Sequence, residues 1–298
     1  RAEMTLPQRY RRCHERNFRA REGEPKIYQT YRRNWGVYNE DTAFGYYIAN
    51  MLQMEVMDRA LGRFLDALEQ RGLYDESLCL LTADHGEMGL SHGGLRQKMF
   101  NAYEETMHMP LIFSNPVVFP QPRTSDALVS LIDLMPTLAT LAKVPDRNNW
   151  TFKGVDFSQI IYDPDTRSVQ DEILFVFDDI KAGQENIEQM VTPPNRIRCI
   201  REQRWKFARY FDAAGQVANE YEMYDLLNDP RELQNLAHPL HPRFNDPEIV
   251  EERKRLAEKL QRIEENRLQP LVTDVIHNES GGAPPILVQT LAELPQSV

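Results

Sequence analysis

Residues 82–92 read TADHGEMGLSH, and they directly follow the apolar run SLCLL at 77–81. A second apolar run, PLIFS, occupies residues 110–114. Neither run alternates apolar with polar residues, so each predicts a strand buried on both faces, as in a parallel sheet covered by helices. In open sheets of this kind, ligands bind beyond the carboxyl ends of the strands. Residues 82–92 therefore lie where a functional site is expected.

Helical patterns flank the two predicted strands. From Asp41 to Arg71, apolar residues recur at spacings of three and four, which places them on one helix face. They are Met54, Met57, Leu61, Phe64, Leu65 and Leu68. Gly72 is suited to end this helix, and the methionines are interpreted as core packing. A second helix is predicted over 133–142, with Asp133 as its N-cap. Helix, strand, loop, strand and helix together indicate an α/β fold.

The pattern of apolar and polar residues changes after Phe157. Short strand-like segments joined by polar turns predict a small antiparallel sheet from residues 172–177, 196–201, 205–211 and 220–224. An amphipathic helix is predicted over 247–267. We expect a large α/β domain over 1–165 and a small sheet subdomain over 166–298. The apolar tail, about 270–298, is expected to lie extended against the large domain or against a second subunit. Only the second alternative would make the protein a homo-oligomer.

Composition and charge exclude several classes of protein. The 298 residues carry 35 Lys or Arg against 45 Asp or Glu, a net charge of −10, so we expect no nucleic-acid partner. No apolar run approaches the roughly 20 residues of a membrane-spanning helix, so we expect no membrane span. Residues 1–35 hold ten basic residues and four Glu. Six of the basic residues form a cluster interpreted as a solvated face or a groove for an anionic substrate: Arg9, Arg11, Arg12, Arg16, Arg19 and Arg21. Three widely spaced cysteines favour a cytoplasmic over a periplasmic location.

Asp84 and His85 carry the chemistry expected at the end of the first strand. A carboxylate oxygen and an imidazole nitrogen both bind divalent metal ions. Gly86 would let the chain turn and bring both side chains toward one ion. Taken alone, an Asp-His-Gly sequence after a strand is more often a turn with solvated side chains.

A set of segments around this site resembles the sulfatase family of the alkaline phosphatase-like superfamily. The resemblance rests on residues 82–87, His92-Gly93, Lys98, Tyr103-Glu104-Glu105, residues 109–112, the helices 57–65 and 129–137, and residues 198–206 and 222–237. It runs from about residue 40 to 240. It implies an alkaline phosphatase-like α/β fold, of which this chain holds the C-terminal part of a large helix-covered mixed sheet and a small antiparallel sheet with one packed helix. A histidine at the position of His85 resembles the subgroup that contains choline-sulfatase-like and phosphonate-monoesterase-like enzymes.

The same resemblance implies roles for individual residues. Asp84 and His85 match two ligands of one divalent ion, which would be Ca, Mn or Mg. Lys98 matches the family's active-site lysine, with Arg96 as the nearby competitor. His92 matches a frequent histidine that would either contact the substrate or pack the loop. A fixed ammonium such as that of Lys98 would stabilise charge developing on the ester oxygens.

The chain departs from the family's pattern in one important respect. Sulfatases convert a Cys or Ser of a C/S-x-P-x-R segment into a formylglycine nucleophile, and none of Cys13, Cys79 and Cys199 fits that segment. The nucleophile and the first metal-binding aspartates would therefore lie before Arg1. We expect this chain to be the C-terminal half of a sulfuric-ester hydrolase whose partner is the N-terminal half of the same protein. Alone, it is expected to bind the ion weakly and to hydrolyse nothing.

Two other functions stay open at the level of sequence. A phosphonate monoester or phosphodiester hydrolase would use the same scaffold, because phosphate and sulfate esters share tetrahedral geometry and in-line displacement. A non-catalytic anion-binding module is the third alternative. The presence of Asp84, His85 and Lys98 together argues against it, because a decayed site would not preferentially spare all three.

Overall fold

The computed structural model describes residues 23–35, 37, 39–163, 165–178 and 192–269. The arginine-rich stretch before residue 22 and the tail 270–298 lie outside the described residues. The domain boundary near residue 165 stays a prediction. None of the described helices is both long and apolar enough to cross a membrane.

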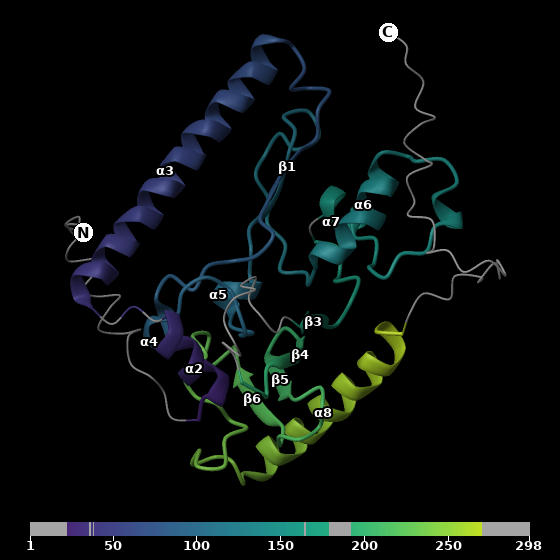
Figure 1. Ribbon diagram of the computed structural model, residues 1–298. Helices are drawn as coiled ribbons and strands as arrows, with labels where there is room; N and C mark the ends of the chain where they lie inside the picture. Colours follow the sequence, from purple (N-terminus) through teal and green to yellow (C-terminus); the bar gives the residue numbers. More distant parts are fainter. Residues whose placement is uncertain (1–22, 36, 38, 164, 179–191, 270–298) are drawn as a thin grey trace, which may run out of the picture.

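A four-stranded antiparallel sheet forms the centre of the second half of the chain (Figure 1). Its strands follow the order of the sequence: β3 (Ile173–Phe177), β4 (Arg196–Arg201), β5 (Trp205–Phe211) and β6 (Glu220–Asp225). Each strand pairs with the next, beginning with Ile173 opposite Arg201. The predicted small antiparallel sheet is therefore confirmed.

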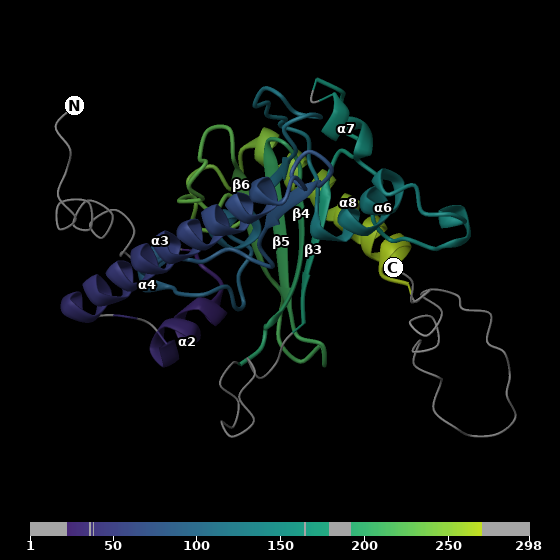
Figure 2. The same ribbon diagram turned by 90° about the horizontal axis from the view of Figure 1, so that it is seen from above.

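Alternate side chains of a strand point to opposite faces of the sheet. Both faces of this sheet are buried, because each is covered by other elements. On one face lies α8 (Pro247–Arg267), with its buried residues Ile249, Leu256, Leu260 and Ile263. On the other face lie α2 (Lys26–Trp35) and the segment 88–103 (Figure 2). The sheet thus connects a structural helix on one side to the candidate site loop on the other.

The long helix α3 (Glu40–Gln70) matches the predicted helix to within a residue at each end. The Asn39 side chain accepts from the Thr42 N–H at 3.0 Å, and Gly72 follows the helix with a φ of +66°. The predicted burial of its apolar face is wrong within this chain. Met54 and Met57 are 66% and 67% exposed, since α3 runs diagonally away from the sheet (Figure 1).

The two apolar runs form β1 (Cys79–Thr82) and β2 (Leu111–Ser114), but they pair antiparallel with each other. The prediction of doubly buried parallel strands is wrong for this chain, because Leu81 and Ile112 are exposed. A parallel pair needs a crossover that returns the chain to the same end of the sheet. Here the connection holds the short helices α4 (Ser91–Gly94) and α5 (Glu104–Met107), and β2 begins beside the residue where β1 ends, with Thr82 opposite Leu111.

Asp133 begins the second predicted helix differently from the expectation. It closes a short 3-10 turn, η1 (Leu131–Asp133), and its Oδ2 accepts from the Ser130 N–H at 2.8 Å. The α-helix α6 (Leu134–Leu141) follows without a side-chain cap. Asp133 Oδ1 accepts from the Val155 N–H at 2.8 Å, so the buried carboxyl ties the helix start to the segment ahead of α7 (Ser158–Tyr162). The 3-10 turn η2 (Arg147–Asn149) lies between α6 and α7 in the sequence.

Candidate active site

Asp84 and His85 follow the end of β1 and lie against each other. The Asp84 Oδ1 accepts from the His85 N–H at 3.0 Å, and the Asp84 Oδ2 lies 3.3 Å from the His85 Nε2. The Asp84 side chain is 84% exposed and that of His85 is 34% exposed. Both side chains are therefore open to an ion or a substrate from outside.

The tautomer of His85 follows from its hydrogen bonds. Its Nδ1 lies 2.8 Å from the Gly86 carbonyl oxygen, which can only accept, so Nδ1 carries the proton. Nε2 is then the ring nitrogen that can offer a lone pair, as a metal-binding histidine must. Adjacent ligands of one ion, each at about 2.3 Å and at right angles, stand about 3.3 Å apart. Asp84 Oδ2 and His85 Nε2 therefore fit two positions of a divalent ion.

Lys98 joins this pair from the far end of the loop. Its Nζ lies 2.5 Å from the His85 Nε2, so a cation already faces the lone pair that the ring presents. The sequence interpretation left Lys98 and Arg96 as competitors. The wall of the neighbouring cleft includes Asp84, His85 and Lys98 together. Arg96 instead interacts electrostatically with Tyr31 of α2 and Tyr46 of α3.

Gly86 is needed for close approach of two backbones. A Cβ at this position would lie 1.9 Å from the Glu105 carbonyl oxygen, and the Gly86 N–H donates to the Thr106 carbonyl at 2.9 Å. The sequence suggested that Gly86 would allow a turn. The structure gives another reason for a glycine, because any side chain would push Asp84 and His85 away from α5.

His92 lies inside the loop packing. Its side chain is 1% exposed, its ring stacks on Tyr103 with the centroids 3.5 Å apart, and its Nε2 lies 3.4 Å from the Glu105 Oε2. The pKa of Glu105 lies below its ordinary value because interactions with His92 outweigh the effect of burial. The catalytic role of His92 stays a prediction, and its burial favours the loop-packing alternative.

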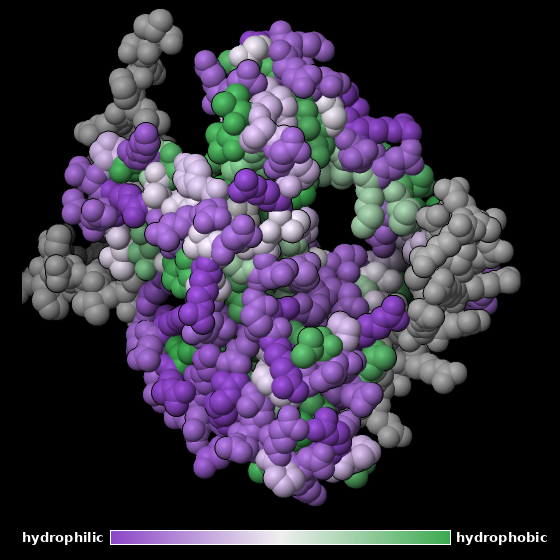
Figure 3. Space-filling view, turned by 180° about the vertical axis from the view of Figure 1, so that it is seen from behind, coloured by the Kyte–Doolittle hydropathy of each residue, from purple (hydrophilic) through white to green (hydrophobic). Residues whose placement is uncertain are grey.

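A cleft of about 1570 Å³ opens beside Asp84, His85 and Lys98. Part of its wall is apolar, from β2, the 117–131 segment and β3. Seen from behind, the molecule shows apolar side chains on its upper lobe beside a deep opening (Figure 3). The exposed side chain of Asp84 and the partly exposed side chain of His85 make the candidate site accessible from this cleft.

Buried charges lie on the sheet side of the loop. The Lys206 Nζ is 2.8 Å from the Glu104 Oε1 and 2.5 Å from the Glu232 Oε1, and it donates to the Ala102 carbonyl at 2.8 Å. These carboxylates raise the pKa of Lys206 although burial opposes its charge. His92, Glu105 and Glu232 come close enough to hold an ion. Because Lys206 and His92 already compensate these carboxylates, the structure favours an ion-pair cluster over a second metal site.

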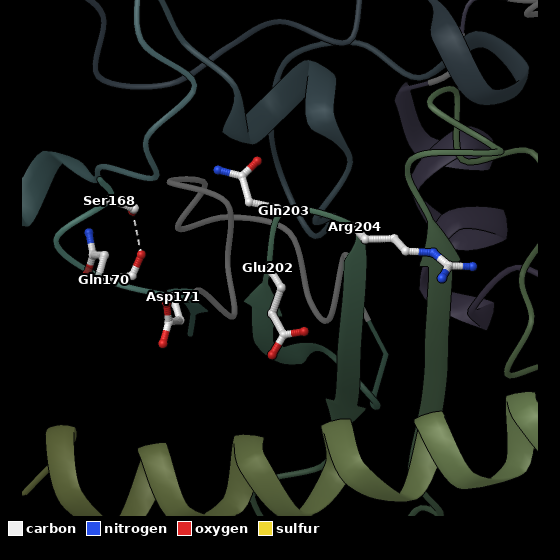
Figure 4. A pocket seen from close by; sticks show the side chains of 6 residues that line it. All are labelled: Ser168, Gln170, Asp171, Glu202, Gln203 and Arg204. Atoms are coloured by element: carbon white, nitrogen blue, oxygen red, sulfur yellow. Dashed lines mark hydrogen bonds between the residues drawn. The ribbon is translucent and has the colours of Figure 1, made fainter. Parts of the chain in front are cut away.

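A smaller pocket of about 370 Å³ lies between α8 and the strand ends (Figure 4). It is lined by Ser168, Gln170, Asp171, Glu202, Gln203 and Arg204. The Glu202 carboxylate is held at 2.5–2.6 Å by Lys259 and Arg255 of α8. These contacts fix the helix to the sheet, and the pocket holds none of the predicted site residues.

Two buried cations were missed by sequence interpretation. Lys206 has the strand pattern of an ordinary polar residue, and Arg32 lies beyond the arginine cluster 9–21 and was assigned no role, yet they are 1% and 5% exposed. No local pattern separates a buried arginine from an exposed one. The contacts that bury Arg32 come from Glu24 and His92, which lie 8 and 60 residues away.

Two family models match the chain. The sulfatase model matches residues 13–144, and the model of the C-terminal region of N-sulphoglucosamine sulphohydrolase matches residues 92–266, more than half of the chain. The chain belongs to the sulfatase family. The mixed α/β architecture with antiparallel sheets is that of an alkaline phosphatase-like fold.

Curated relatives include an endo-4-O-sulfatase of Bacteroides thetaiotaomicron, 29% identical over 70% of this chain and 39% of its own length. Human arylsulfatase K is 24% identical over 60% of this chain and 31% of its own length. This chain thus spans well under half the length of these relatives.

Solved structures show the same fold. The phosphonate monoester hydrolase of Agrobacterium radiobacter matches with a TM-score of 0.56 and 26% identity, over 70% of this chain and 39% of that one. A protein in complex with its substrate D-glucosamine-2-N,6-O-disulfate matches with a TM-score of 0.59 and 24% identity, over 80% and 44%.

Proposed function

We propose that this chain is the C-terminal half of a formylglycine-dependent sulfuric-ester hydrolase that uses one divalent ion, Ca, Mn or Mg, and acts on a small-molecule sulfate ester. The observation that carries the proposal is the convergence of Asp84, His85 and Lys98 at an open cleft in a member of the sulfatase family. Asp84 and His85 would be metal ligands, and Lys98 would contact the ester.

Each of these residues has a separate task. Asp84 supplies a negative oxygen, and His85 supplies Nε2 because its Nδ1 proton is committed to Gly86. The Lys98 ammonium would bind the ester oxygens, where negative charge develops as the bond to the leaving alcohol breaks. The divalent ion, when bound, would polarise the sulfate.

The nucleophile and the other metal ligands would come from an N-terminal half of the same protein. Two observations support this partner. The chain spans 31–39% of the length of its curated relatives, and the apolar side chains of α3 and β2 are exposed in it. An N-terminal half that packs on these elements would bury them and complete the site.

The direct test compares full-length protein with an Asp84→Ala variant, by elemental analysis and by hydrolysis of an aryl sulfate. The variant is expected to lose both the ion and turnover, because a charged ligand is removed. His85→Asn is expected to be milder, since an amide oxygen can still coordinate. A full metal complement in Asp84→Ala would show that the ligand assignment is wrong.

A phosphonate monoester or phosphodiester hydrolase is the second candidate. The observation that favours it is the likeness to the Agrobacterium radiobacter phosphonate monoester hydrolase. Matched aryl sulfate and aryl phosphonate esters decide between the two. A preference of the full-length protein for the phosphonate by tenfold or more would overturn the first proposal.

A further inference from the structure

The loop that delivers Lys98 has an unusual backbone. Between Leu90 and Phe100, four non-glycine residues have positive φ: Leu90 at 70°, His92 at 51°, Gln97 at 58° and Phe100 at 57°. Such conformations are strained for residues with a side chain, and they persist only where surrounding structure enforces them. The loop therefore requires support from outside itself.

Helix α2 supplies contacts at two points of this backbone. The Arg32 guanidinium donates twice to the His92 carbonyl, from Nε at 3.1 Å and from Nη2 at 2.6 Å. The Tyr31 hydroxyl donates to the Arg96 carbonyl. Glu24 holds Arg32 in place at 2.6 Å, and both side chains of this pair are about 5% exposed. The two bonded carbonyls lie six and two residues before Lys98.

The contacts are aimed at the backbone, which separates them from ordinary side-chain packing. Arg32 and Tyr31 are adjacent residues that engage carbonyls four residues apart in the loop. The helix is itself anchored to the sheet, since the Tyr28 hydroxyl bonds to the buried Glu222 at 3.0 Å. This series of contacts links β6 through α2 to the loop that carries Lys98.

We propose that Arg32 and Tyr31 are positioning residues, which clamp the 90–98 backbone so that the Lys98 ammonium is held at the cleft next to Asp84 and His85. Its consequence for turnover rests on the proposed hydrolase function. The ordering of the 90–98 backbone by Arg32 and Tyr31 does not depend on that function. Misplacing a catalytic group by about 1 Å can lower turnover by about 10²-fold, so a loosened loop is sufficient to impair Lys98.

The test measures hydrogen exchange of the 88–98 amides in the full-length protein, together with kcat, KM and metal content. Arg32→Ala is expected to accelerate exchange in this loop but not in α8. It is expected to lower kcat about 10–100-fold, with KM and metal content little changed. Guanidinium ion added to Arg32→Ala is expected to restore part of both readouts. Arg33→Ala is the matched control, because Arg33 is the exposed neighbour on the same helix.

Tyr31→Phe provides a milder variant, since it keeps the ring and removes the hydroxyl that reaches the Arg96 carbonyl. It is expected to accelerate loop exchange less than Arg32→Ala does, while the fold is retained. Unchanged exchange over 88–98 in a folded Arg32→Ala or Tyr31→Phe protein would overturn the clamp. Faster loop exchange in a protein without ester hydrolysis would support the clamp and count against the hydrolase function.

Discussion

Lys98 and Arg96 are two basic residues of one loop with different surroundings. The Lys98 Nζ reaches the His85 Nε2, whereas Arg96 interacts electrostatically with Tyr31 and Tyr46. In the full-length protein, Lys98→Ala is expected to lower turnover by about 10²–10³ and to leave the metal in place, because one electrostatic stabiliser is lost. Kinetic assays beside elemental analysis check this. A larger loss of turnover in Arg96→Ala than in Lys98→Ala would reverse the assignment.

Glu104 predicts an acid sensitivity of the fold. Burial alone would raise its pKa, but ion pairs with Lys206 and Arg201 outweigh burial and hold the pKa below its ordinary value. A carboxyl with a lowered folded pKa stabilises the protein above its unfolded pKa, and this contribution disappears as pH falls through the folded pKa. The wild type should therefore lose stability more steeply than Glu104→Gln between about pH 5 and pH 3.

The measurement is the midpoint of thermal unfolding against pH. Glu76→Gln serves as a control, because Glu76 is an exposed glutamate outside this cluster. Its curve should follow the wild type. If Glu104→Gln and the wild type fall in parallel over this range, the buried ion pairs contribute nothing to acid stability.

At the scale of elements, α8 contributes the apolar face that covers one side of the sheet. Leu256 is fully buried there, whereas Val250 on the same helix is 41% exposed. Leu256→Ala is expected to destabilise the protein by about 2–5 kcal/mol through lost burial and a residual cavity. Val250→Ala should cost well below 1 kcal/mol, as most exposed substitutions do. Urea unfolding of both variants tests this, and equal midpoints would contradict the packing of α8.

The same elements show what the sequence could determine. The apolar spacing in α3 and α8 and the short segments of the sheet were sufficient, because local periodicity sets the type of an element. The antiparallel pairing of β1 with β2 was not predictable, since a short run of consecutive apolar residues does not fix the direction of the neighbouring strand. Asp84, His85 and Lys98 were found as a constellation through family resemblance. Arg32 and Lys206 were missed because their contacts are long-range.

Over the whole molecule, the largest departure from expectation is the exposed face of α3. Ala43 is the buried residue of this 31-residue helix, while the stripe at Met54, Met57 and Phe64 is 55–67% exposed. Exposed apolar surface of this kind marks an interaction site or a tendency to aggregate. The proposed N-terminal half would cover it. The face of the small sheet is already covered by α8, so the two halves of this chain should behave differently when the chain is made alone.

The 298-residue chain alone is therefore expected to self-associate through the α3 stripe. Replacing Met54, Met57 and Phe64 together by Gln should lower its mass in light scattering and its binding of an apolar dye, because the exposed apolar area is removed. The sheet subdomain should be unaffected. The matched control changes Glu55, Asp58 and Glu69 of the same helix to their amides, which alters charge but not apolar area. In the full-length protein the apolar-to-Gln variant should instead lose stability, since the stripe would be buried there. A wild-type chain that stays monomeric and binds no dye would contradict both the exposed stripe and the partner proposed to cover it.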